Sequence, residues 1–146
     1  MPEFLERILL LKQSTVFSEV SSADLRIVAQ MLEEEIYFTG DRVFDVNEHG
    51  DHMYILQSGR IGIYLNPEQK MKEFIAEIGP GDCFGEMNLL DELPRSATAR
   101  VLEDSIVLSL KKNRLRDLII NYPELGIGIL KGYCLRLRKA KLKNFG

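Results

Sequence analysis

Apolar and polar residues follow distinct spacings in successive parts of this chain of 146 residues. Apolar residues recur at helical intervals over 4–11 and, after the capping group Ser21–Asp24, over 25–32. From residue 36 to 110 short β-branched and aromatic runs alternate with turns, and helical spacing returns from Lys111. The pattern predicts N-terminal helices, a β region and a C-terminal helix pair whose last helix opens at Pro123.

The central runs are short and evenly spaced, which is typical of an antiparallel sandwich or small barrel. Gly, Asn, Asp and Pro separate them and supply the turns. Glu33–Glu35 is expected to end the second helix as a solvated face. The predicted strands are 36–38, 42–44, 53–56, 60–65, 74–78, 98–102 and 105–110, with turns at 40–41, 50–51, 58–59, 66–67 and 79–82.

Composition fits a globular protein with one domain. The chain is 45% apolar and 28% charged, with a formal net charge of −3, which gives no general attraction to nucleic acid. No apolar run is long enough to span a bilayer, and the N-terminus does not resemble a signal peptide. Cys83 and Cys134 are expected to be reduced, buried thiols, with a single disulfide as the alternative. A cytoplasmic location is therefore expected.

The stretch 84–99 carries the most specific chemistry. Glu86 can accept hydrogen bonds from sugar hydroxyls, and Arg95 presents a planar fork of donors that matches phosphate oxygens. Gly85 lets the backbone approach a ligand closely. Between these groups, residues 87–90 can form a short helical turn whose N–H groups point at an anion. These features predict a site for one small anionic ligand that carries a hydroxyl and a phosphate.

This stretch resembles the phosphate-binding cassette of the cyclic-nucleotide-binding domain family, with its F-G-E-x-x-L-L and P-R-S/A-A-T core. Earlier glycines at 40, 50 and 59 also agree, whereas Asn47 stands where members usually have Gly. Asn tolerates left-handed backbone, so the turn can be kept.

The resemblance implies a mainly β fold. It is an antiparallel β-roll of the double-stranded β-helix, jelly-roll-like type, flanked by N-terminal helices and a C-terminal helix pair. All of 1–146 would be one cyclic-nucleotide-binding domain. Its parts would be N-terminal helices over 1–35, a β-roll over 36–110 with the cassette at 84–99, and C-terminal helices that act as a lid over 111–146.

The resemblance also implies roles for individual residues. Glu86 would accept from the ribose 2′-hydroxyl, and Arg95 would bind the cyclic phosphate with help from the Ser96 hydroxyl. The alternative for Arg95 is a surface salt bridge with Asp91 or Glu92. Backbone N–H groups that assist the phosphate would lie around Gly85, Met87, Asn88 and Ala97.

Base recognition is less constrained. Arg136 lies where some related channel domains carry an arginine, so it would stack on or bond to the base. Its alternative is a solvated arginine in a basic helix. Ser96 permits both cAMP and cGMP, and the P-R-S-A-T pattern favours cAMP. Gly126, Gly128 and Gly132 lower helix propensity, so the lid is expected to be loosely held until ligand orders it.

A regulatory module that senses a cyclic nucleotide is the leading interpretation. No nucleophile–base pair suggests an enzyme, and His49 and His52 lack a third ligand for a metal. No cofactor besides the ligand, no DNA-binding domain and no membrane span are expected. One alternative is a domain that has lost its ligand and acts in protein interaction or dimerisation. Asn88, which either donates a bond or crowds the pocket, favours that alternative.

The second alternative is the sensor arm of a longer enzyme or transporter. The last helix is expected to be the contact for a homodimer or an effector domain. It is strongly basic after Glu124, and one interpretation of these charges is a docking surface for an acidic partner, a membrane or nucleic acid. The simpler interpretation of these charges is a solvated face that complements the helix dipole.

Overall fold

The computed structural model describes residues 2–145, and the side chains of 3–87 and 89–142. Its contacts divide the chain into two compact units. One is helical and combines Met1–Met31 with Arg114–Gly146, and the other is the β unit Leu32–Asn113. The predicted order of helices, β region and helix pair is confirmed.

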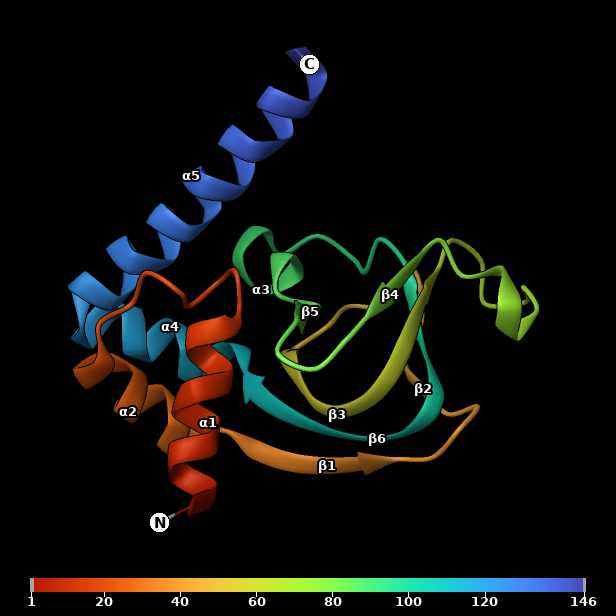
Figure 1. Ribbon diagram of the computed structural model, residues 1–146, viewed down its shortest axis with the longest axis horizontal. Coiled ribbons are helices and arrows are strands. Elements are labelled where there is room, and N and C mark those ends of the chain that lie inside the picture. Colours follow the sequence, from red (N-terminus) through yellow and green to blue (C-terminus); the bar gives the residue numbers. More distant parts are fainter. Residues whose placement is uncertain (1, 146) are drawn as a thin grey trace. The chain divides into compact units, whose positions relative to one another are not determined.

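The β unit is an antiparallel sheet that winds into a roll (Figure 1). Its main path runs β1–β6–β3–β4, while β2 pairs with β6 and β5 pairs with β3. A 3-10 turn, Met71–Glu73, precedes β4, and the short helix α3, Met87–Asp91, follows β5. The strands are β1 Glu33–Tyr37, β2 Arg42–Phe44, β3 His52–Tyr64, β4 Ala76–Ile78, β5 Cys83–Phe84 and β6 Thr98–Lys111.

Two predicted breaks between strands are wrong, because β3 and β6 are each continuous. One is the turn at 58–59, and the other is the gap between the predicted strands 98–102 and 105–110. Residues 58–59 lie inside β3, and the pairing with β6 shifts register there instead of ending. Gly59 has φ +101°, and a Cβ on it would lie 2.1 Å from Ser105 Oγ and 2.6 Å from the Asp104 carbonyl oxygen. Glycine is therefore required at this position, where β3 and β6 approach closely and shift register as at a β-bulge.

The second correction concerns Glu33–Glu35. These residues begin β1 rather than end α2, which spans Ser22–Met31. Their backbone pairs with β6, and Ser109 Oγ donates to the Glu33 carbonyl at 3.3 Å. Helical spacing in the preceding residues hid this, because surface glutamates suit a helix end and an exposed strand equally well.

The helical unit contains α1 Pro2–Gln13, α2, α4 Lys112–Asn121 and α5 Pro123–Phe145. The predicted cap of α2 is present, since the Asp24 N–H donates to Ser21 Oγ at 3.2 Å. Pro123 opens α5, where a missing N–H is harmless. Cys134 in α5 is exposed and Cys83 is half-buried, so the expectation that both thiols are buried is wrong, and the two cysteines do not form a disulfide with each other. No helix among residues 2–145 is both long enough and apolar enough to cross a membrane.

The core of the β unit lies inside the roll. Apolar residues from β3, β5 and β6 form it, and partly buried side chains from β1, β2 and β4 pack against it. This arrangement leaves the cassette segment at one edge of the core, between β5 and β6. The buried members are Tyr54, Leu56, Ile61, Phe84, Ala99, Val101 and Val107.

Candidate functional site

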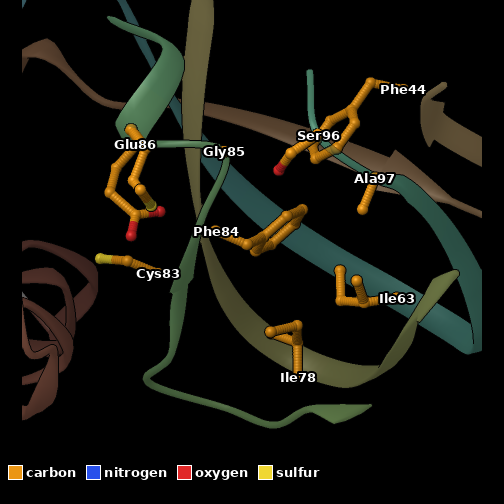
Figure 2. A pocket seen from close by; sticks show the side chains of 10 residues that line it. Phe44, Ile63, Ile78, Cys83, Phe84, Gly85, Glu86, Ser96 and Ala97 are labelled. Atoms are coloured by element: carbon orange, nitrogen blue, oxygen red, sulfur yellow. The ribbon is translucent and has the colours of Figure 1, made fainter. Parts of the chain in front are cut away.

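The cassette segment bounds a cavity of about 210 Å³ in the β unit. The chain leaves β5, turns at Gly85 with φ +75°, forms α3 and returns to β6 through residues 94–97. Five of the predicted site residues line the cavity, namely Gly85, Glu86, Met87, Ser96 and Ala97. Phe44, Ile63, Ile78, Cys83 and Phe84 complete the lining (Figure 2).

The lining combines apolar walls with a few polar groups. Figure 2 shows Glu86 and Ser96 on different sides of Phe84. Glu86 is only 7% exposed although it is acidic. Charged side chains are rarely buried to this extent unless they are paired or hydrogen-bonded. Such a cavity suits a ligand with an apolar face and hydroxyl groups.

The cavity is small for a ligand site. Pockets for small molecules usually measure roughly 300–1,000 Å³, and this cavity has about 210 Å³. A ligand of ordinary size would therefore extend beyond its mouth into solvent, unless further protein groups cover it.

Arg95 lies beside this cavity in a buried position and is not part of its lining. Its side chain is 3% exposed. Nη1 donates to the Gly85 carbonyl and Nη2 to the His52 carbonyl, both at 2.7 Å. The guanidinium carbon stands 4.1 Å from the centre of the Phe44 ring. The alternative of a solvent-exposed salt bridge is therefore wrong for Arg95, and the exposed Glu92 pairs with Lys112 at 3.0 Å.

Burial lowers the pKa of Arg95, because removal from water disfavours the charged form. Nearby acidic groups oppose this effect, and arginine is basic enough to keep its charge at neutral pH. The same burial raises the pKa of Tyr54 to about 12. The site thus holds a cation in a mostly apolar environment, where its attraction to an anion is stronger than in water.

The turn before β3 fixes the backbone of Arg95. The Asn47 N–H donates to the Arg95 carbonyl at 2.8 Å, and the Arg95 N–H donates to the Glu48 carbonyl at 2.7 Å. Asn47 has φ +71°, so the prediction that Asn keeps the left-handed turn is confirmed. Gly50 lies against the guanidinium, since a Cβ there would stand 2.2 Å from Arg95 Cζ.

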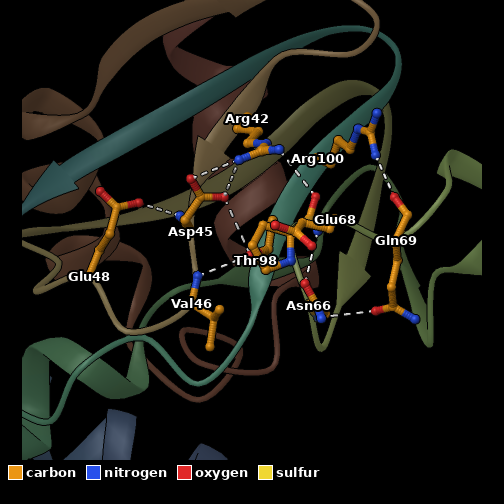
Figure 3. A network of polar contacts seen from close by, with 10 residues as sticks. Arg42, Asp45, Val46, Glu48, Asn66, Glu68, Gln69, Thr98 and Arg100 are labelled. Carbon is orange, nitrogen blue, oxygen red and sulfur yellow. Dashed lines mark hydrogen bonds and ion pairs between the residues drawn. The ribbon is translucent and has the colours of Figure 1, made fainter.

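Polar contacts tie this turn to β6 (Figure 3). The Val46 N–H donates to Thr98 Oγ1 at 3.0 Å, and the same hydroxyl donates to Asp45 Oδ1 at 3.4 Å. Asp45 also pairs with Arg42 at 3.2 Å. Because Thr98 is fully buried, its hydroxyl is held in place, and its bonds fix the turn whose backbone binds that of Arg95.

Two predicted residues remain without a described place in the cavity. The backbone of Asn88 lies in α3, and its side chain is outside the described residues. Arg136 belongs to the helical unit, where its Nη2 donates to Thr15 Oγ1 and its guanidinium carbon lies 5.3 Å from the Tyr133 ring centre. A contact between Arg136 and a ligand stays a prediction.

Sequence reasoning missed the apolar walls of the cavity. Ile63 and Ile78 occur in strand-like runs that also supply the core, so no local signal separates them from core residues. Phe84 opens the cassette motif but was given no role in the site. Phe44 was hidden by an irregularity in β2. Arg42 pairs with Arg100 but Phe44 pairs with Ala99, so β2 has one residue more than its partner.

Comparison with known proteins agrees with this geometry. The family model for the cyclic nucleotide-binding domain matches residues 34–122. A CRP-like cAMP-activated global transcriptional regulator of Mycobacterium tuberculosis is 27% identical over 130 residues, which are 89% of this chain and 58% of the relative. A cAMP-dependent protein kinase regulatory subunit of Debaryomyces hansenii is 34% identical over 109 residues, which are 75% of this chain and 23% of that protein.

Among solved structures, the N-terminal domain of a transcriptional regulator from Streptomyces coelicolor is 25% identical, with a TM-score of 0.78 over 90% of this chain and 94% of that chain. The chain thus spans less than two thirds of the two sequence relatives, 58% and 23% of their lengths. The match of the family model over the whole β-roll, and the fold shared with this neighbour, show that the chain belongs to the cyclic nucleotide-binding domain family.

Proposed function

We propose that this chain senses a cyclic nucleotide, with cAMP preferred over cGMP, and that it regulates rather than catalyses. The observation that carries the proposal is the cassette cavity, with Glu86 and Ser96 in its lining and the buried cation of Arg95 beside it. A hydroxyl acceptor, a hydroxyl donor and a cation at one small cavity match the ribose and phosphate of one ligand.

Glu86 accepts from the ribose 2′-hydroxyl in this proposal, and Ser96 donates to the phosphate. Arg95 acts on the phosphate from behind Gly85, whose carbonyl already binds its Nη1. The backbone N–H groups of residues 85, 87, 88 and 97 complete the phosphate contacts. The purine lies on the apolar walls, where burial of its flat face supplies the non-directional part of the affinity.

The preference for cAMP rests on two supports. The P-R-S-A-T pattern at 94–98 favours it, and the two sequence relatives are named for cAMP. The helix α5 is proposed to respond to the ligand as a lid, with Arg136 as its contact to the base. The output that the sensor controls lies in whatever effector it is joined to or binds.

Calorimetric titration with cAMP and cGMP tests the binding proposal. We expect micromolar affinity for cAMP and weaker binding of cGMP. Arg95→Gln and Glu86→Gln should each weaken cAMP by at least tenfold, because each removes a charged hydrogen bond of roughly 1.5–3 kcal/mol. Arg60→Gln is the matched control, since Arg60 is an exposed cation whose bonds go to Glu77 and Glu103. Absence of binding by either nucleotide, or equal losses in all three variants, would refute the proposal.

The lid proposal has its own measurement. Hydrogen exchange over 123–142 should slow when cAMP saturates the chain, and Arg136→Ala should reduce both the protection and the affinity. Unchanged exchange with saturating ligand would exclude a response of α5.

A second candidate function is a protein-interaction module without ligand. The observation that favours it is the exposed apolar surface of α5, where Ile127, Leu130 and Leu137 are 43%, 64% and 63% exposed. Sedimentation of the chain with and without cAMP separates the two candidates. A stable dimer together with no thermal shift in millimolar cAMP or cGMP would favour this second function.

A further inference from the structure

Phe44 is brought to the cavity by the irregular pairing of β2. Strict alternation would place Arg42 and Phe44 on one face of the sheet, since side chains repeat every second residue. The extra residue in β2 breaks this alternation, so that Phe44 pairs with the buried Ala99 instead of following Arg42 outward. Both Val43 and Phe44 then pack against the core cluster.

The ring of Phe44 contacts both the cavity and the Arg95 guanidinium in this position. It lines the cavity, and its face lies 4.1 Å from the guanidinium carbon of Arg95. Phe44 also stacks near Tyr54, with ring centres 6.0 Å apart, and near Phe84 at 6.1 Å. These neighbours limit the rotation of the ring, so the face that it presents to Arg95 is fixed.

The guanidinium of Arg95 is bounded on several sides. Phe44 covers one side, and Gly50 leaves room on another that a Cβ would fill, 2.2 Å from Cζ. The carbonyls of Gly85 and His52 hold the two terminal nitrogens. The two carbonyl bonds fix the positions of the terminal nitrogens. The aromatic face limits rotation of the guanidinium plane about the line that joins these nitrogens.

We propose that Phe44 is a positioning residue for phosphate recognition, which acts by holding the Arg95 guanidinium in place. This proposal rests on the proposed function and deepens it. A planar cation over an aromatic face is attracted most strongly when both are removed from water. The guanidinium then meets an anion without first losing freedom of motion, and such preorganisation raises affinity.

The competing explanation is that Phe44 only forms a wall for the base. The two explanations differ in what a ligand without phosphate experiences. A wall contributes equally to cAMP and adenosine, whereas a positioning residue contributes to cAMP alone. They also differ once Arg95 is removed, because a positioning residue then has nothing to position.

The test is a double-mutant cycle of Phe44→Leu and Arg95→Ala, with cAMP and adenosine measured by competition. Phe44→Leu should weaken cAMP by about fivefold to thirtyfold, the range of a desolvated cation–π contact, and adenosine by less than about twofold. In the Arg95→Ala background Phe44→Leu should weaken cAMP by less than about twofold, as it does adenosine. Phe44→Tyr keeps the aromatic face and should restore affinity for cAMP to within about twofold. Ile63→Val is the wall control and should weaken both ligands equally.

A measurement without ligand keeps the positioning claim independent of the proposed function. The Arg95 Hε resonance of the wild-type chain should lie upfield from the ring current of Phe44. This shift should persist in Phe44→Tyr and be mostly lost in Phe44→Leu, where the Tyr54 ring, 6.0 Å from the guanidinium carbon, remains. If no nucleotide binds but the shift is present, the proposed function fails and the Phe44–Arg95 arrangement stands. An unshifted resonance, equal losses for cAMP and adenosine, or additive effects in the cycle would overturn the inference.

Discussion

Replacing Gly50 by alanine tests how tightly Arg95 is held. A Cβ at this position would stand 2.2 Å from Arg95 Cζ and Nε and 2.3 Å from Nη2. The side chain of a surface arginine would swing away at little cost. Here the Phe44 ring and two carbonyl bonds surround the group, so the new methyl must displace it from its site.

The expected loss follows from these distances. An ordinary contact needs 3.4 Å, so the guanidinium must move by the difference from 2.2 Å, about 1.2 Å. A shift of that size breaks at least one of its two bonds, and a hydrogen bond to a charged group is worth roughly 1.5–3 kcal/mol. The reduced freedom of the unfolded chain returns about 0.4–1 kcal/mol, because the φ of Gly50 is not in the left-handed region. The free energy of unfolding should therefore fall by about 0.5–2.5 kcal/mol.

Urea denaturation followed by circular dichroism measures this change, with the slope of the transition as a check on the unfolded state. Gly79→Ala is the matched control. A Cβ on Gly79 would meet only Asp82 Oδ2, at 3.8 Å, so this variant should be neutral or slightly more stable than the wild type.

The decisive comparison uses Arg95→Ala as background. Without the guanidinium, the three atoms nearest to the new Cβ are absent, and Gly50→Ala should be neutral or slightly stabilising. If Gly50→Ala is harmless in the wild-type chain, Arg95 is not pinned as described. If it is equally harmful in both backgrounds, the clash involves the backbone rather than Arg95.

The remaining predictions concern the turn, the pH response and the last helix. Asn47→Gly should leave the urea midpoint of unfolding unchanged. Asn47→Val should lower the free energy of unfolding by about 1–2 kcal/mol, because a β-branched residue is strained at φ +71°. Equal stability of the two variants would contradict this expectation. The hydrogen bond from His52 lowers the pKa of the Asp51 carboxyl below its usual 3.8. The ionised Asp51 therefore stabilises the folded chain above pH 3.8, and this contribution is lost as the pH falls through the lowered pKa. Asp51→Asn should accordingly flatten the acid limb of a stability–pH curve, and an unchanged limb would exclude the contribution. Gly132→Ala should destabilise the chain by about 1–3 kcal/mol and speed hydrogen exchange in α5, since a Cβ would lie 2.5 Å from the Thr15 carbonyl oxygen. If the free energy of unfolding instead rises by roughly 1 kcal/mol, the gain expected from helix propensity, α5 is loosely packed there.

The glycines of α5 show how a local inference can miss a packing role. Propensity alone predicts a weak helix at Gly128 and Gly132. In the helical unit both glycines lie where α5 passes close to the segment 15–20, with a Cβ on Gly128 only 2.9 Å from Val20 Cγ2. Small residues there allow the backbones to approach, which propensity cannot express because it contains no information about neighbours in space.

The order of the elements and most of the cassette followed from the sequence, because both depend on local signals. Spacing and capping groups act over a few positions, so they located α2 and the opening of α5, while the turn at Asn47 came from the family resemblance. The cassette was equally visible, since Gly85, Glu86 and Ser96 lie close together in the chain and line the same cavity.

Tertiary structure decided the features that depend on partners distant in sequence. The sequence could not show that Gly59 bends a continuous strand, because the strand it bends against lies more than forty residues away. Nor could it show that Arg95 is buried between Phe44, Gly50 and two carbonyls, since burial of a charge is decided by everything that packs around it. Local chemistry therefore located the cassette residues of the candidate site, and long-range pairing of β2, β3 and β6 determined its apolar walls and how its cation is held.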